Sequence, residues 1–207
     1  MPTSATQSAT QSSRQKLTRA DLWGLEQYAS ERDGFRARVL AHKVPRRIAL
    51  DAHATLLFED FLTMKYQVQE MLRTERIFEP SEIQGEIDAY NPLIPDGDNW
   101  KATLLIEYAD VEERKVALAQ LRGVEDRVWA QVPGGERVFA IANEDMPRSN
   151  DDKTAAVHFL RFQLPAAAIA AIREGAGIRM GIDHPAMNCA VDLDAASVRS
   201  LAADLAA

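Results

Sequence analysis

Apolar residues recur at helical spacing in several separate stretches of the chain. The clearest stretch spans residues 61–78, where the apolar stripe consists of Leu62, Met64, Val68, Met71, Leu72 and Phe78. A second helix is expected at 80–90, since Pro80 suits a first helical turn and Asn91-Pro92 ends the pattern. The two predict a helical hairpin. Further helices are expected at 18–33, 35–43, 110–121, 165–174 and 195–205.

Short runs with strand-like patterns lie between these helices. They cover residues 46–50, 54–59, 101–108, 128–132, 137–142, 154–164, 178–182 and 190–193. Glycines in Pro133-Gly134-Gly135 favour a hairpin turn, because glycine adopts the positive φ that such turns need. Strands joined by short turns and interleaved with uneven helices predict an α+β fold.

The expected architecture is a largely antiparallel sheet of short strands, with the helical hairpin and further helices packed on it. Residues expected at the interface between the helix 61–78 and the sheet are Val68, Met71, Leu72, Leu160 and Phe162.

The first 15 residues contain no acidic residue and no run of large apolar side chains. We therefore expect a disordered tail at 1–15 and a single α+β domain at 16–207. An organelle transit peptide is the alternative, although such peptides are rich in arginine and this segment has only Arg14. The longest apolar run, 164–172, is too short to cross a membrane, which takes about 20 residues.

The net charge and the number of cysteines indicate which binding partners and which cellular compartment suit this chain. The net charge of −7 argues against nucleic acids and anionic membranes, because both attract basic surfaces. Cys189 is the only cysteine of the chain, so neither an intrachain disulfide nor a cysteine-based zinc or iron–sulfur site can form from it alone. A reducing cytoplasm fits this composition.

Two histidines are candidate metal ligands. His53 and His184 fall in predicted loops, with Asp51 and Asp183 close by in sequence. Together with Glu59 or Asp183, they could bind iron, manganese or zinc and leave coordination positions open. Ordinary turns, in which an aspartate accepts hydrogen bonds from nearby amides, explain the same pattern equally well.

The other polar candidates have structural alternatives too. Glu70 lies on a polar stripe of the helix 61–78 and could act as an acid or base, but a solvated helix face also explains it. His42 is expected to bind the last carbonyls of a helix, and His158 to be a hydrogen-bonded core residue. Cys189 could be a nucleophile, although a small buried side chain is its commoner role.

Motifs of several enzyme classes are missing from the sequence. It has no G-x-x-x-x-G-K-[ST] phosphate loop, no strand-linked G-x-G-x-x-G, no H-E-x-x-H and no G-x-S-x-G. No histidine follows a glutamate by three positions, as a ferritin-like di-iron site requires.

Particular strings resemble a known family. They are HATLLFED at 53–60, YQVQEMLRTERIFE at 66–79, DAYNPLIPDG at 88–97, ATLLIEYADVEER at 102–114, ERVFAIANED at 136–145, TAAVHFLRFQL at 154–164 and GIDHP at 181–185. Over residues 16–205 the chain resembles the bacterial DUF3501 family, a domain of unknown function. The resemblance implies no assigned activity and no established site residues. It also implies genes that lie beside those for rubrerythrin and an iron–sulfur oxidoreductase.

Three hypotheses follow. The first is a cytoplasmic accessory or interaction protein of a peroxide or redox response, without a cofactor of its own. Its expected partners are rubrerythrin-like or iron–sulfur proteins, and a homo-oligomer is possible. The second is a metal-dependent enzyme or metal-binding protein using His53, His184 and Glu59 or Asp183, with Glu70 as acid or base. The third is a regulatory protein that binds a small ligand between a sheet and a helix.

Overall fold

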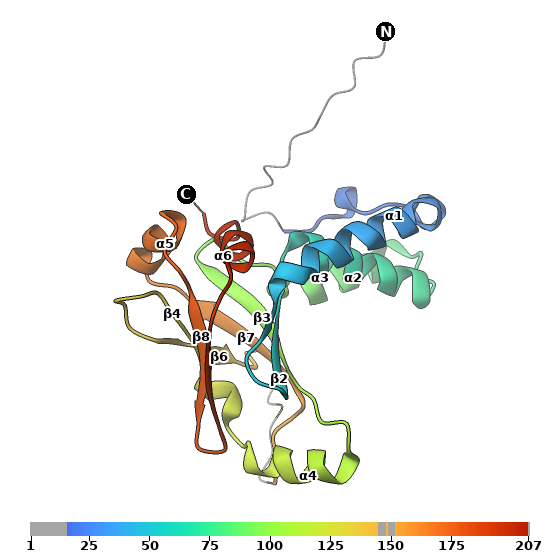
Figure 1. The fold of residues 1–207 in the computed structure, drawn as a ribbon. Coiled ribbons are helices and arrows are strands. Elements are labelled where there is room, and N and C mark those ends of the chain that lie inside the picture. Colours follow the sequence, from blue (N-terminus) through green and yellow to red (C-terminus); the bar gives the residue numbers. More distant parts are fainter. Residues whose placement is uncertain (1–15, 145–147, 149–151, 207) are drawn as a thin grey trace.

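The computed structural model describes residues 16–144, 148 and 152–206, and the tail expected at 1–15 lies outside them. Two antiparallel sheets form the centre of the fold, as Figure 1 shows. The strands of the first sheet, in spatial order, are β1 (Arg47–Ala49), β2 (Ala54–Glu59), β3 (Asn99–Ile106), β7 (Val157–Gln163) and β6 (Ile141–Ala142). Those of the second are β5 (Val138–Phe139), β4 (Val128–Gln131), β8 (Arg179–His184) and β9 (Met187–Asp192). The α+β prediction is confirmed.

Helices surround the sheets in separate groups (Figure 1). Their bounds are α1 Leu25–Lys43, α2 Phe61–Thr74, α3 Pro80–Tyr90, α4 Val111–Gln120, α5 Ala166–Arg173 and α6 Ala195–Ala202. Short 3-10 helices cover Arg19–Asp21, Val44–Arg46 (η2), Asn91–Leu93 and Val124–Arg127. The hairpin predicted for α2 and α3 is confirmed, since both contribute to one apolar cluster. None of the described helices is long and apolar enough to cross a membrane.

The main core lies between the two sheets. Leu56, Leu104 and Phe162 of the first sheet share one buried cluster with Val128 and Met180 of the second. Alternation along each strand produces this packing, because every second side chain points to the same face of its sheet.

A second core lies among the helices and corrects the predicted interface. Val68, Leu72, Leu160 and Phe162 are at most 3% exposed, as expected, whereas Met71 is only partly buried. Val68 and Leu72 nevertheless belong to a separate helical cluster, so the single helix–sheet interface predicted for these residues is wrong. The core face of β7 packs against the second sheet instead of α2.

Helix α1 is longer than the sequence pattern predicts. The sequence pattern predicts a break between two helices at Gly34. Helix α1 instead continues through Gly34 to Lys43. Tyr28, Phe35 and Val39 bury one face of α1, and the Phe35 ring lies 5.8 Å from that of Tyr66 on α2. This packing outweighs the helix cost of glycine, about 1 kcal/mol. The long helix therefore delivers its C-terminal end, followed by η2, to the β1–β2 hairpin.

Candidate functional site

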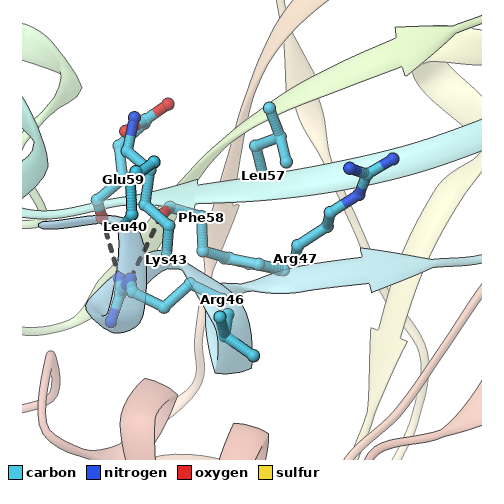
Figure 2. A pocket seen from close by; sticks show the side chains of 8 residues that line it. Leu40, Lys43, Arg46, Arg47, Leu57, Phe58 and Glu59 are labelled. Carbon is cyan, nitrogen blue, oxygen red and sulfur yellow. Dashed lines mark hydrogen bonds between the residues drawn. The ribbon is translucent and has the colours of Figure 1, made fainter. Parts of the chain in front are cut away.

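A pocket of about 370 Å³ lies where the end of α1 and η2 meet the β1–β2 hairpin (Figure 2). Its lining residues are Leu40, Lys43, Val44, Arg46, Arg47, Leu57, Phe58 and Glu59. This volume is within the range of small-molecule sites, which runs from about 300 to 1,000 Å³.

Strand alternation determines which side chains of the hairpin face this pocket. Leu56 and Phe58 are at most 2% exposed and point into the main core. Leu57 and Glu59 therefore point to the opposite face of β2. Arg47 pairs directly with Leu57 in the antiparallel register, so it shares that face. Figure 2 shows the side chains of Arg47 and Glu59 on either side of Leu57.

Arg46 forms the buried base of the site and is only 2% exposed. Its guanidinium donates to the carbonyl oxygens of Phe58 at 3.1 Å and Glu59 at 3.0 Å. It also pairs with Asp204, with Nη2 and Oδ2 2.6 Å apart. These bonds fix the end of β2 against the C-terminal segment. They also occupy the hydrogen-bond donors of Arg46 with protein groups.

Asp60 joins the same network at the start of α2. Its Oδ1 accepts a hydrogen bond from the Thr63 amide at 2.9 Å, which caps the helix. Its Oδ2 is hydrogen-bonded to Nε2 of His42 and lies 3.5 Å from Nη1 of Arg46. Burial opposes ionisation of Asp60, but the His42 hydrogen bond and the Arg46 charge lower its pKa to about 2. The expected contact of His42 with helix carbonyls is replaced by this carboxylate.

Glu59 differs from its neighbours because one of its oxygens is unsatisfied. Its Oε2 is buried and has no hydrogen-bond partner. Burial raises the pKa of Glu59, although Thr63 and the charge of Lys43 act in the opposite direction. Within the described part of the chain, neither Lys43 nor Arg47 forms an ion pair within 4 Å. The pocket thus combines a buried acceptor, two available cations and apolar walls.

The two histidines predicted as metal ligands have structural partners. The His53 ring is hydrogen-bonded through Nδ1 to the Glu107 carbonyl oxygen at 2.8 Å and stacks on Tyr108, with ring centroids 4.0 Å apart. The His53 amide donates to Oδ1 of Asp51 at 3.0 Å, which is the turn interaction given as the alternative.

His184 is the last residue of β8 and is 8% exposed, so the loop predicted for it is wrong. Its Nε2 donates to the Arg122 carbonyl oxygen at 3.0 Å, and its Nδ1 accepts from the Ala186 amide at 3.1 Å. The neighbouring Asp183 pairs with Arg137 at 3.1 Å. The strand extends further than expected because β8 and β9 pair as far as His184 and Met187.

The metal-ligand candidates are not gathered into one site. Glu59 lines the α1–β2 pocket, while Asp183 and His184 line a separate shallow depression with Pro185. Across the residues that the structure describes, no group of three or more His, Cys, Asp or Glu side chains could hold a metal ion.

Glu70, the candidate acid or base, is fixed by α1. Its carboxylate accepts two hydrogen bonds from Arg32, at 2.8 and 2.7 Å, and one from the Tyr28 hydroxyl at 2.6 Å. The Arg32 hydrogen bonds, more than any other contact, lower the pKa of Glu70 to about 2. A carboxylate held ionised in this way ties α2 to α1 and is a poor proton donor or acceptor near neutral pH.

Comparisons with known proteins identify the family of the chain and a similar crystal structure. The family model for a protein of unknown function, DUF3501, matches residues 16–205. The chain belongs to the DUF3501 family. A crystal structure of a novel protein of unknown function from Burkholderia pseudomallei K96243 is similar, with a TM-score of 0.87 and 48% sequence identity. The alignment covers 92% of this DUF3501 chain and 100% of that chain. A comparison with curated proteins gives no match.

Sequence reasoning missed most of the residues around the pocket of this DUF3501 protein. Glu59 was a candidate, but as a metal ligand. Arg46 and Asp204 gave no local signal, because their contact joins segments 158 positions apart, whereas Asp60 was missed although its cap contact with Thr63 is local. The expected core role of His158 is confirmed: it is fully buried, and its Nε2 lies 2.9 Å from Oγ1 of Thr154.

Proposed function

We propose that this DUF3501 protein is a ligand-binding accessory protein of a redox system, and that the α1–β2 pocket holds its ligand. One observation carries the proposal: the Oε2 atom of Glu59 is buried at the wall of an open pocket without a hydrogen-bond partner. An unsatisfied buried polar group costs about 1–3 kcal/mol. A ligand that donates a hydrogen bond there would remove this cost.

Binding is favoured over catalysis at this site. Asp60, His42 and Arg46 are hydrogen-bonded to one another or to nearby backbone, and Asp204 is engaged by Arg46. Glu70 is held by Arg32 of α1. The proposal therefore includes no cofactor and no metal.

The redox setting rests on the family resemblance and on the single cysteine, which suits a reducing cytoplasm. The expected partner is a rubrerythrin-like or iron–sulfur protein. Leu40 and Val44 support a role for the pocket rim in such contacts, since they are 47% and 72% exposed beside the pocket. A partner that contacts this rim would respond to whether the pocket is occupied.

Equilibrium dialysis against a small-molecule extract of bacterial cells tests the proposal. Wild type should retain a small molecule, and Leu57→Trp, which fills the pocket, should not. Leu105→Trp is the matched control, because Leu105 lies on the same sheet face but does not line the pocket.

Association with a purified rubrerythrin-like protein is then measured with and without the retained molecule. The proposal predicts that the molecule changes the affinity. Retention of nothing by wild type, or equal retention by Leu57→Trp, would refute the ligand site. An affinity for the redox partner that does not respond to the molecule would refute the accessory role.

A further inference from the structure

Charges of opposite sign flank Leu57 in the pocket. Glu59 lies two residues further along β2, and Arg47 lies directly across on β1. The diagonal separation of such positions is about 7–8 Å. A carboxyl group with one buried oxygen and a guanidinium therefore stand on either side of an apolar patch, with space for a short ligand between them.

The two ends of this arrangement differ in what they can bind. At Glu59, the unsatisfied Oε2 accepts a hydrogen bond, and it favours a cationic donor because charge-assisted bonds are about twice as strong as neutral ones. At the other end, Arg47 is exposed and forms no ion pair within 4 Å in the described part of the chain. Its planar fork matches a carboxylate.

The walls between the charged groups are apolar. Leu40 and Val44 of the α1–η2 segment face the pocket together with Leu57 of β2. A branched aliphatic side chain would bury its surface there, at about 25 cal/mol for each Å² removed from water.

Resting on the proposed function, we infer that the pocket binds a small zwitterion with an aliphatic side chain, of the class of the apolar α-amino acids. The ligand ammonium group donates to Oε2 of Glu59, the ligand carboxylate accepts from Arg47, and the side chain packs against Leu40, Val44 and Leu57. Arg46 takes no part in ligand binding, since its donors are used by Phe58, Glu59 and Asp204.

Isothermal titration calorimetry with three related probes tests this inference on the full chain. L-Leucine carries both charged groups, 4-methylpentanoate lacks the ammonium group, and 3-methylbutylamine lacks the carboxylate. We expect saturable binding of leucine, with each truncated probe weaker by about tenfold or more. Absence of leucine binding at millimolar concentration, or equal binding of all three, would overturn the inference.

Two variants assign the two ends of the ligand. Glu59→Gln should weaken leucine and 3-methylbutylamine by about tenfold and leave 4-methylpentanoate unchanged. Arg47→Met should do the reverse, weakening leucine and 4-methylpentanoate only. Both should keep the melting temperature of wild type within a few degrees, because Glu59→Gln conserves shape and Arg47 is exposed. Leucine binding that neither variant weakens would place the ligand elsewhere.

The outcomes separate this inference from the function on which it rests. If wild type retains a molecule of another class in dialysis while leucine does not bind, the ligand class is wrong and the binding function stands. If it retains nothing and leucine does not bind, both are wrong. A third outcome applies if Lys43 alone neutralises Glu59. Leucine then fails to bind and Lys43→Met lowers the melting temperature, a result that also overturns the inference.

Discussion

Arg46 and Asp204 are 158 positions apart in the sequence, yet their side chains form a buried ion pair with Nη2 and Oδ2 2.6 Å apart. Arg46 lies at the base of the α1–β2 pocket, and Asp204 follows α6 near the C-terminus. Arg46 also binds the carbonyl oxygen of Ser200 at 3.2 Å. The C-terminal segment is thus part of what holds the pocket in shape.

Loss of Asp204 should be strongly destabilising. Asp204→Ala leaves the Arg46 guanidinium buried without its main counter-ion, which typically costs about 3–5 kcal/mol. Urea denaturation measures the effect as the change in the free energy of unfolding. Asp192→Ala is the control, because Asp192 is exposed and its pair with Arg179 is long, at 3.8 Å. Equal stability of the two variants would show that the buried pair has no special role.

Asp60 should contribute to the loss of stability in acid. Its folded pKa of about 2 lies below the ordinary 3.8. Its contribution is therefore present above pH 3.8 and is lost as the pH falls through about 2; it amounts to about 2 kcal/mol. Asp60→Asn keeps the helix cap but removes the titration, so its unfolding free energy should fall less between about pH 5 and pH 2 than that of wild type.

Asp110→Asn serves as the control for this prediction. Asp110 caps α4 through the Glu113 amide in the same way, and among the described residues it forms no ion pair within 4 Å. Asp110→Asn keeps its helix cap as well, so its unfolding free energy at neutral pH should stay close to that of wild type. Asp204 acts in the opposite sense to Asp60: burial raises its pKa to about 6, so its ionisation lowers stability as the pH rises from about 4 to 6. If the unfolding free energies of Asp60→Asn and wild type fell equally between about pH 5 and pH 2, the low pKa assigned to Asp60 would be contradicted.

The two apolar clusters should respond independently to mutation. Phe162→Ala should cost about 3–5 kcal/mol and Leu72→Ala about 2–5 kcal/mol, from lost transfer energy and the cavities that remain. Because Phe162 and Leu72 belong to separate clusters, the double variant should be additive within about 0.5 kcal/mol. A coupling free energy well above that value, measured by urea denaturation, would support the single helix–sheet interface that the sequence predicts.

Gly181 and Gly85 should respond in opposite ways to alanine. A Cβ atom at Gly181 would lie 2.2 Å from the Cys189 carbonyl oxygen and 2.6 Å from the Trp129 ring, so β4, β8 and β9 would have to separate. Gly181→Ala should therefore lower the melting temperature. Gly85 lies within α3, and no atom lies within 4 Å of its Cβ position. Gly85→Ala should therefore raise the free energy of unfolding by about 0.5–1 kcal/mol, and the melting temperature with it. A neutral Gly181→Ala would refute the close approach at Trp129.

Local sequence patterns predicted the elements of this fold better than their assembly. The α2–α3 and β1–β2 hairpins follow from residues close in sequence. Alternation in β7 showed that Leu160 and Phe162 face a core, but it could not show that a second sheet lies opposite. Glycine disfavours helix, so the sequence pattern predicts a helix end at Gly34, whereas the aromatic packing of Phe35 and Tyr28 overrides that preference.

The candidate site was predicted only in part, for the same reason. Glu59 stood out as a carboxylate at the end of a strand, but its role depends on Lys43 and Val44 being brought over the hairpin by the uninterrupted α1. The Arg46–Asp204 pair has no local signature at all. Asp183 and Pro185 favour turns and predict a loop at His184, although strand pairing extends to His184 itself.

The most direct test of the account is the pKa of Glu59 measured by NMR from its side-chain carboxyl carbon, with and without L-leucine. Burial should place the pKa of the free protein above the ordinary 4.5. The ligand ammonium should lower it, because a cationic donor at Oε2 stabilises the carboxylate. A pKa at the ordinary value in the free protein, or one that saturating leucine does not lower, would contradict the claim that Glu59 is the ligand acceptor of this pocket.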